Sequence, residues 1–255
     1  YHSVKSGIAV NSGSSANLVA FSSLLELKKI KKGDEVIVPS TTFATVVSPL
    51  YQLGLVPVYV DIENSNWNIN ANLIEQAISP KTKAIMPVHT LGFPADMKLI
   101  NDIAKKYKLL VIEDCCEAHG ARYKDKVVGS ISDISTFSFF VAHNITTGEG
   151  GMILTDNEDF EISMRSIREF GRLLNYDSRF TSAGKMQNYD SRYMFMKIGY
   201  NLRMSDIASS MGIEQIKKLD KINEIRRHNA AYLSSALKHL ENHIYIPKLS
   251  LIHIS

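Results

Sequence analysis

The chain has 255 residues, of which 45% are hydrophobic and 22% charged, and its formal net charge is +3. These values are typical of a soluble globular protein with one large domain, or one such domain and a fragment of a second. No run approaches the eighteen apolar residues of a membrane span, and lysines gather only at 28–32, at the end of a predicted helix. We therefore expect neither a membrane nor a nucleic acid as a partner.

The two cysteines are the neighbours Cys115 and Cys116. Adjacent cysteines cannot form an ordinary intramolecular disulfide, and they do not have the spacing of a zinc site. A reducing, cytoplasmic location is therefore expected. The chain begins with Tyr1 and not with methionine, so we expect it to be part of a longer protein.

The N-terminal half of the chain alternates short apolar segments with amphipathic ones. Helices are predicted at 16–27, 42–53, 70–78 and 94–107, the last with Pro94 as its first helical residue. Strands are predicted at 33–39, 55–60, 83–88 and 109–112. This alternation is typical of βαβ units, and it predicts an α/β fold with a mostly parallel sheet and helices on both faces.

Small residues fill the turn before the first helix, Asn11-Ser-Gly-Ser-Ser-Ala16. A serine at a helix N-cap satisfies free backbone N–H groups, and the remaining N–H groups with nearby hydroxyls can hold an anion. Ordinary capping and an anion site are both open interpretations of this turn.

The segment 136–151 joins an apolar, strand-like run to a polar turn and a glycine-rich exit, and His143 lies at the break. Ligands of parallel sheets bind beyond the carboxyl ends of the strands. This rule places Phe43, His89, Asp114 and the segment 136–151 at one edge of the sheet. His143 is therefore a candidate for chemistry, and an ordinary loop histidine is the alternative.

The C-terminal part continues with a predicted strand at 152–155, a helix at 159–170, a polar loop at 171–191 and helices at 205–219 and 221–240. We expect residues 1–215 to form one large domain. Residues 216–255 are expected to supply a linking helix and the start of an incomplete C-terminal domain.

Four motifs follow one another along the chain. They are Gly33-Asp-Glu-Val-Ile-Val-Pro-Ser-Thr-Thr-Phe43, His89-Thr-Leu-Gly-Phe-Pro-Ala-Asp96, Val111-Ile-Glu-Asp-Cys-Cys-Glu-Ala-His-Gly120, and Phe137-Ser-Phe-Phe140 with Thr147-Gly-Glu-Gly-Gly151. In combination they resemble the sugar aminotransferase family of fold type I pyridoxal-phosphate enzymes, which act on nucleotide-linked keto sugars. The resemblance covers nearly the whole chain. It implies the large domain of that fold, a nucleotide-linked keto sugar as substrate, and a homodimer with a shared active site.

The resemblance also implies how the cofactor phosphate would be bound. Gly13, Ser14 and Ser15 would hold it at the helix N-terminus, which agrees with the anion site that the small-residue turn allows. Ser138 would add its hydroxyl, and Asn201 would reach the phosphate from the partner subunit.

Two residues would contact the cofactor ring. Phe43 would stack on one face of the pyridine, and Asp114 would pair with the pyridinium nitrogen. A carboxylate there keeps that nitrogen protonated, so the ring can act as an electron sink. A core phenylalanine and a helix-capping aspartate are the alternatives.

The sequence departs from the aminotransferases at one position, because His143 stands where they carry the lysine that forms a Schiff base. Imidazole cannot form that bond stably, so the cofactor would be held non-covalently as pyridoxamine 5'-phosphate. The departure resembles the 4-keto-6-deoxy-sugar 3-dehydratase branch, in which this histidine removes a proton and then protonates the leaving C3 hydroxyl. Glu117, three residues after Asp114, is an acid as in that branch, and it joins the catalytic and cofactor-binding candidates.

One kind of 3-dehydratase holds a two-iron, two-sulfur cluster on four cysteines, most of them after a Phe-Gly-Arg-like sequence. Here no cysteine follows Phe170-Gly-Arg172, so we predict neither a cluster nor another metal, and we expect glutamate to regenerate the cofactor. The local sequence Glu113-Asp-Cys-Cys116 nevertheless resembles the cluster-bearing dehydratases more closely. A sugar aminotransferase without its lysine, and a non-catalytic protein that binds the cofactor or a sugar nucleotide, are the alternatives.

Overall fold

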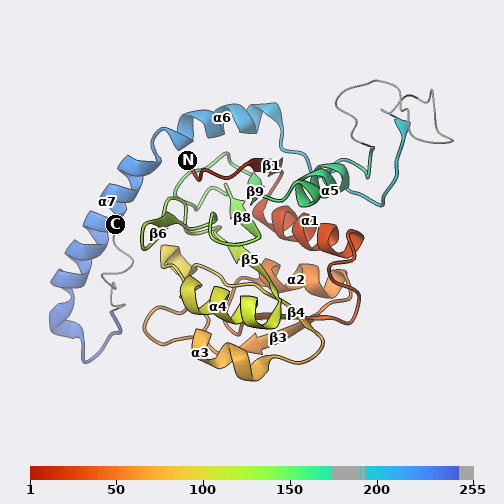
Figure 1. Ribbon diagram of the computed structural model, residues 1–255. Helices are drawn as coiled ribbons and strands as arrows, with labels where there is room; N and C mark the ends of the chain where they lie inside the picture. Colours follow the sequence, from red (N-terminus) through yellow and green to blue (C-terminus); the bar gives the residue numbers. More distant parts are fainter. Residues whose placement is uncertain (174–189, 191–192, 247–255) are drawn as a thin grey trace.

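A seven-stranded sheet forms the centre of the computed structural model, which describes residues 1–173, 190 and 193–246 (Figure 1). Its strands lie in the order β1-β9-β8-β5-β4-β2-β3, and β6 and β7 form a separate hairpin. The strands are β1 (Ser6–Val10), β2 (Glu35–Pro39), β3 (Val56–Val60), β4 (Thr82–Ile85), β5 (Leu110–Asp114), β6 (Arg122–Tyr123), β7 (Lys126–Val127), β8 (Ile134–Ser138) and β9 (Gly151–Thr155).

The helices connect these strands in chain order. The α-helices are α1 (Gly13–Glu26), α2 (Ala44–Gln52), α3 (Ala71–Ile74), α4 (Met97–Tyr107), α5 (Glu158–Arg168), α6 (Asp206–Ile216) and α7 (Leu219–Ala236), and short 3-10 helices are η1 (Glu75–Ala77), η2 (Thr90–Gly92) and η5 (Lys238–Leu240). Within the sheet, β3, β2, β4, β5 and β8 pair in parallel, whereas β9 is antiparallel to both β8 and β1. The predicted α/β fold with a mostly parallel sheet is confirmed.

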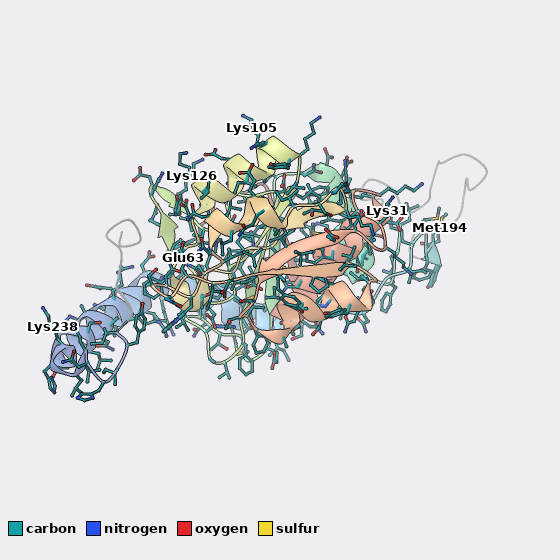
Figure 2. The ribbon with its side chains drawn as sticks, turned by 90° about the horizontal axis from the view of Figure 1, so that it is seen from below. Lys31, Glu63, Lys105, Lys126, Met194 and Lys238 are labelled. Carbon is teal, nitrogen blue, oxygen red and sulfur yellow. The ribbon has the colours of Figure 1, made fainter. Side chains whose placement is uncertain are left out.

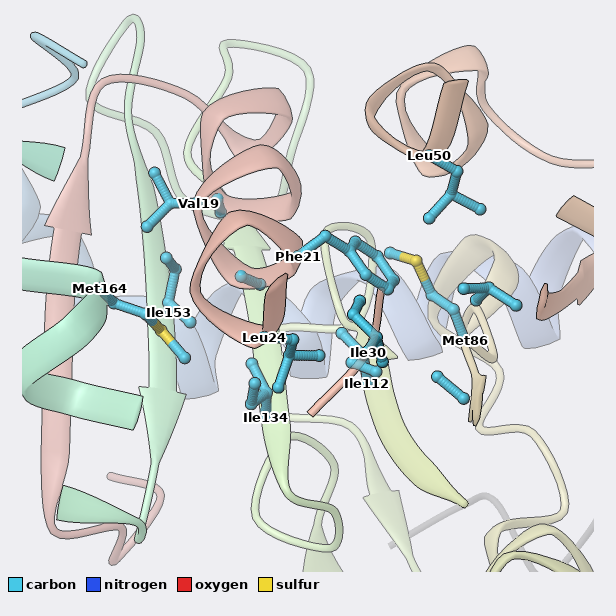
Figure 3. Packing of buried hydrophobic residues seen from close by; sticks show 14 of the residues in the cluster. Val19, Phe21, Leu24, Ile30, Leu50, Met86, Ile112, Ile134, Ile153 and Met164 are labelled. Atoms are coloured by element: carbon cyan, nitrogen blue, oxygen red, sulfur yellow. The ribbon is translucent and has the colours of Figure 1, made fainter. Parts of the chain in front are cut away.

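Alternation along the strands builds a core on each face of the sheet. Val36 and Val38 of β2 join the cluster under α1, α2 and α5, whereas Ile37 joins the cluster under α3 and α4. Figure 3 shows Phe21 and Leu24 of α1 within the first cluster. Successive side chains of a strand point to opposite faces, so a continuous apolar strand such as β2 must be covered on both sides.

Two helices begin three residues away from their predicted first residues. Helix α1 begins at Gly13, three residues early, because the Ser12 side chain caps it by accepting a hydrogen bond from the Ser15 N–H at 3.0 Å. The prediction that Pro94 is the first helical residue is wrong. Helix α4 begins at Met97, since Asp96 provides the cap, accepting from the Leu99 N–H at 3.2 Å.

The sequence pattern missed some short elements. Strand β1 and the β6–β7 hairpin were not predicted, because each is too short or too mixed in polarity to show a period. The predicted helix at 70–78 is divided into α3 and η1. The lysines at 28–32 follow the end of α1 and do not lie in its last turn.

Helices α6 and α7 run around the edge of the layered body, and α7 extends beyond it (Figure 1). Figure 2 shows Lys238 of η5 at the far end of this extension. Both helices were predicted, and their division from the large domain at residue 215 stays a prediction. The loop predicted at 171–191 falls mostly outside the described residues. Among the described residues, no helix has the length and apolarity that a bilayer crossing requires.

Candidate active site

The candidate site lies where the parallel strands end. Strands β2, β4, β5 and β8 run in one direction, and β1 shares it because β1 and β8 are both antiparallel to β9. The carboxyl ends of these strands therefore face one edge of the sheet. Phe43, Asp114 and the loop after β8 leave the sheet at this edge, as the sequence predicted, and the turn before α1 does so too.

The turn before α1 lies against the end of β8. A Cβ atom added to Gly13 would lie only 2.6 Å from the Cβ of Ser138 and 3.1 Å from the Sγ of Cys116. Ser138 is buried, and its Oγ accepts a hydrogen bond from the Phe140 N–H at 3.3 Å. The backbone at Gly13 thus comes close enough to bring a helix N-terminus and the Ser138 hydroxyl to the same place.

This arrangement fits a phosphate group. The first N–H groups of a helix have no partner within it, so those at Gly13 and Ser14 are available to an anion. Ser14 is exposed, whereas Ser15 is buried and its Oγ accepts a hydrogen bond from the Ser12 Oγ at 3.0 Å. We infer that Ser12, which the sequence analysis treated only as a possible cap, orients the Ser15 hydroxyl.

Substituting Gly13 with alanine is expected to destabilise the fold by about 1–3 kcal/mol, because the added methyl overlaps Ser138 and Cys116. Urea unfolding measures this change. Gly212→Ala is the matched control, since Gly212 is also helical and its added Cβ would meet only the Thr147 methyl at 3.2 Å. A Gly13→Ala variant as stable as the Gly212→Ala variant would contradict the close approach.

Asp114 ends β5 on the α1 side of the sheet. Alternation gives Asp114 the same face as Ile112, which belongs to the core cluster under α1. Its carboxylate is buried and accepts hydrogen bonds from the Asn17 Nδ2 at 3.1 Å and the Cys116 N–H at 3.0 Å. Asn17 also donates to the Thr45 carbonyl at 3.1 Å.

Asn17 was not predicted as a site residue. Its position four residues after Gly13 places both on one face of α1, and this spacing is the signal that was available. The Asn17 Oδ1 is buried and has no hydrogen-bond partner among the described residues. This buried polar atom lies beside Asp114 and the proposed phosphate site at the start of α1. Its lack of a partner fits a site in which a bound ligand completes the contacts.

His143 lies on the loop between β8 and β9. Its N–H donates to the Phe140 carbonyl at 3.0 Å, and the loop is closed by the bond from the Phe139 N–H to the Gly150 carbonyl at 2.9 Å. The imidazole is half-buried. Burial lowers its pKa below the ordinary value, Glu117 and Asp114 oppose this change, and Arg226 adds to it. His143 therefore stays neutral, as a base must, to a lower pH than an exposed histidine.

The turn after β5 brings two more side chains to His143. Glu117 accepts a hydrogen bond from the Leu91 N–H at 2.6 Å, so its carboxylate is tied to η2 while its charge acts on His143. The buried His119 ring lies 5.9 Å from the His143 ring, centroid to centroid. Burial and the charge of His143 lower the pKa of His119 to about 3, and a backbone hydrogen bond with Ser138 acts in the opposite direction. His119 was not predicted as a site residue.

Two predicted residues of the site are exposed. Phe43 directly precedes α2 and is 74% exposed, which leaves its ring free to contact a ligand. Asn201 is exposed too, and the carbonyl of its neighbour Leu202 accepts a hydrogen bond from the Asn11 N–H at 2.9 Å. The stacking of Phe43 and the reach of Asn201 across a dimer both stay predictions.

His89 lies near the edge as predicted, but its side chain turns into the protein. The Ala95 N–H donates to the His89 Nδ1 at 3.0 Å, so the ring proton is on Nε2 and faces the Glu113 carboxylate at 3.0 Å. Glu113 also accepts from the Gly129 and Ile131 N–H groups and the Ser132 hydroxyl. The structural role of this network was not predicted.

The same network includes ligand atoms of His89, Glu113 and Cys115 within 4.8 Å of one another. A metal would need a free histidine lone pair and a thiolate. Here the His89 lone pair accepts from Ala95, and burial raises the pKa of the Cys115 thiol well above its ordinary value. These three residues therefore do not fit a metal as they are arranged.

A Glu113→Gln substitution is expected to lower the free energy of unfolding by about 1–3 kcal/mol, because an amide group would point at donors. Burial alone would raise the Glu113 pKa, but the hydrogen bonds from His89, Ser132 and Gly129 lower it below 4.5. The stabilisation is therefore present above pH 4.5 and is lost as the pH falls through the folded-state pKa. Urea unfolding as a function of pH measures this, with the exposed Glu158→Gln as control, and equal acid sensitivity in both variants would contradict the assignment.

Several known proteins are similar to this chain in sequence. A sequence model of the DegT/DnrJ/EryC1/StrS aminotransferase family matches residues 1–250. The lipopolysaccharide biosynthesis protein RfbH of Salmonella typhimurium is 38% identical over 255 residues, covering 94% of this chain and 58% of RfbH. A GDP-4-keto-6-deoxy-D-mannose 3-dehydratase of Yersinia pseudotuberculosis is 38% identical over 234 residues, covering 90% of this chain and 60% of that protein.

A solved structure has the same fold. The E. coli GDP-4-keto-6-deoxy-D-mannose 3-dehydratase with bound hydrated PLP superposes with a TM-score of 0.85 at 35% identity, over 96% of this chain and 63% of that one. The chain thus spans less than two thirds of the length of these relatives. The family match nevertheless covers almost all of its residues. The chain belongs to the DegT/DnrJ/EryC1/StrS aminotransferase family.

Proposed function

We propose that this chain is part of a pyridoxamine-phosphate-dependent 3-dehydratase that acts on a nucleotide-linked 4-keto-6-deoxyhexose. The observation that carries the proposal is His143, a half-buried, neutral base at the place where the resemblance puts the Schiff-base lysine of the aminotransferases. The enzyme would act in the cytoplasm, where its two thiols stay reduced. Its product would be a deoxysugar for a surface polysaccharide, as the name of the relative RfbH suggests.

The residues at the sheet edge fit the cofactor. Gly13, Ser14, Ser15 and Ser138 would bind its phosphate, and the buried Asp114 carboxylate would face its ring nitrogen. When bound, the cofactor would supply an amine for the C4 ketone and an electron sink. Nothing in this set forms a covalent bond to it, in keeping with the absence of a lysine from the position of His143.

His143 would move the proton that dehydration requires. The neutral imidazole takes a proton at a ring nitrogen and then delivers it to the departing C3 hydroxyl, so one residue acts as base and acid. Glu117, held by the Leu91 N–H, stabilises the protonated ring between these two transfers, since its charge raises the His143 pKa. Phe43 would cover the ring of the cofactor with its exposed face.

Removal of the C3 hydroxyl is a two-electron reduction of the sugar. Oxidation of glutamate to 2-oxoglutarate balances it and releases ammonia. One water leaves from C3 and one is consumed by hydrolysis, so the overall reaction forms no net water. A homodimer would complete each site with Asn201 of the partner subunit. The substrate, the amino donor and the dimer are parts of this proposal, and the dehydratase from Yersinia supports the first by its name.

The alternative function is amine transfer to the sugar, which the aminotransferase members of the family favour. Incubation with pyridoxamine phosphate, glutamate and a GDP-linked 4-keto-6-deoxyhexose separates the two. Mass spectrometry should show a sugar that has lost its C3 oxygen, with equal amounts of ammonia and 2-oxoglutarate. A product with an amino group at C4 and an intact C3 hydroxyl would overturn the dehydratase assignment.

A further inference from the structure

We propose that Asn223 of α7 is a positioning residue that holds the His143 loop against the turn after β5. The inference rests on the proposed function of His143. Asn223 is only 8% exposed, although the α7 residues that follow it, 224–229, are all exposed.

Two hydrogen bonds join Asn223 to the site. Its Nδ2 donates to the His119 carbonyl at 2.8 Å, and its Oδ1 accepts from the Asn144 Nδ2 at 2.7 Å. A carbonyl can only accept, so the contact with His119 fixes which end of the Asn223 amide is the donor. The Oδ1 must then face Asn144, which in turn must donate. One side chain thus uses both ends of its amide to connect two loops.

The fold makes room for this residue. Gly120 has a φ of +76°, and a Cβ atom there would lie 2.8 Å from the Asn223 Nδ2 and 3.4 Å from Leu219. A side chain at position 120 would therefore require the Asn223 amide and the Tyr1 hydroxyl, 2.7 Å from that Cβ, to move. Leu219 is fully buried beside it, so the start of α7 is anchored against the turn by an apolar and a polar contact together.

The two loops that Asn223 joins carry the groups that act on His143. Asn144 is the next residue after His143, and His119 follows Glu117 by two positions. The charged groups that act on the His143 imidazole are Glu117 and Asp114 from the β5 side and Arg226 from α7, one turn beyond Asn223. Because Asn223 connects these elements, its loss would let the His143 loop separate from the turn and from Arg226 and admit water around the ring.

The test is the titration of His143, followed by NMR in the full chain with labelled histidine and assigned with a His143→Gln variant. Asn223→Ala should raise the His143 pKa toward about 6.5, because less burial and a more distant Arg226 both favour the charged ring. Asn144→Ala removes only the hydrogen bond between Asn223 and the His143 loop, and it should raise the His143 pKa as well. Asn229→Ala, on the exposed part of α7, should leave it unchanged.

Kinetics provide the second measurement. Asn223→Ala should lower kcat by about 10- to 100-fold with little change in KM or in cofactor binding, because it misplaces a base without removing a ligand. An unshifted His143 pKa in folded Asn223→Ala would overturn the inference. If that variant does not fold, an unshifted pKa in Asn144→Ala overturns it equally. If the wild-type protein lacks dehydratase activity while the pKa shift is present, the proposed function fails and the positioning role stands.

Discussion

His143→Asn is expected to lower kcat for dehydration by about 10²–10⁴-fold while leaving cofactor affinity nearly unchanged. The amide fills much of the same space but does not take up a proton near neutral pH, so both transfers lose their carrier. The phosphate cradle at Gly13 and the Asp114 carboxylate are untouched by this change. Initial rates of ammonia release measure the first effect, and a titration of the bound cofactor by absorbance measures the second.

A control must show that the loss of turnover comes from the His143 imidazole and not from replacing any histidine. His228→Asn serves as the control, because His228 lies on the exposed surface of α7 and has no assigned role. In the wild-type protein, the acid limb of the kcat profile should fall below pH 6.5, since burial lowers the His143 pKa. A His143→Asn variant that turns over at the wild-type rate would rule out His143 as the base.

The sequence predicted those parts of the fold that depend on neighbours along the chain. Apolar runs identified β2 to β5, and the rule for parallel sheets brought Phe43, Asp114 and the His143 loop to one edge. Helix boundaries were less accurate, because a cap at Asp96 overrides the preference of Pro94 for a first turn. Strand β1 carries no clear period, and its pairing with β9 defines it.

The contacts inside the candidate site could not be predicted from neighbours along the chain. Asn17 and Asp114 are 97 residues apart, and Asn223 and His119 are 104 apart, so no local pattern links either pair. The adjacent acids Glu113 and Asp114 look alike in sequence, yet strand alternation sends Asp114 to Asn17 and Glu113 to His89. The family resemblance had selected Asp114 for the cofactor, and the fold adds that Glu113 belongs to a buried network.

Asp114→Asn is expected to lower kcat/KM by about 10²–10³-fold, because an amide cannot keep the ring nitrogen of the cofactor protonated. It should also destabilise the fold by about 1–3 kcal/mol, since the new NH₂ group would face a donor, either the Asn17 Nδ2 or the Cys116 N–H. Steady-state rates and urea unfolding measure the two effects. A lower rate in this single variant could therefore come from the lost ring contact or from the lower stability of the fold.

Exchanging the two side chains separates these effects. In the double variant Asn17→Asp with Asp114→Asn, the new amide at 114 can donate to residue 17 while its oxygen still accepts from the Cys116 N–H. Stability should recover only in part relative to Asp114→Asn, because the carboxylate at position 17 accepts from the new amide but faces the Thr45 carbonyl without a proton to donate. Activity should stay low, because the carboxylate has moved away from the ring nitrogen. Recovery of activity together with stability would mean that Asp114 supports the fold of the site and takes no part in its chemistry.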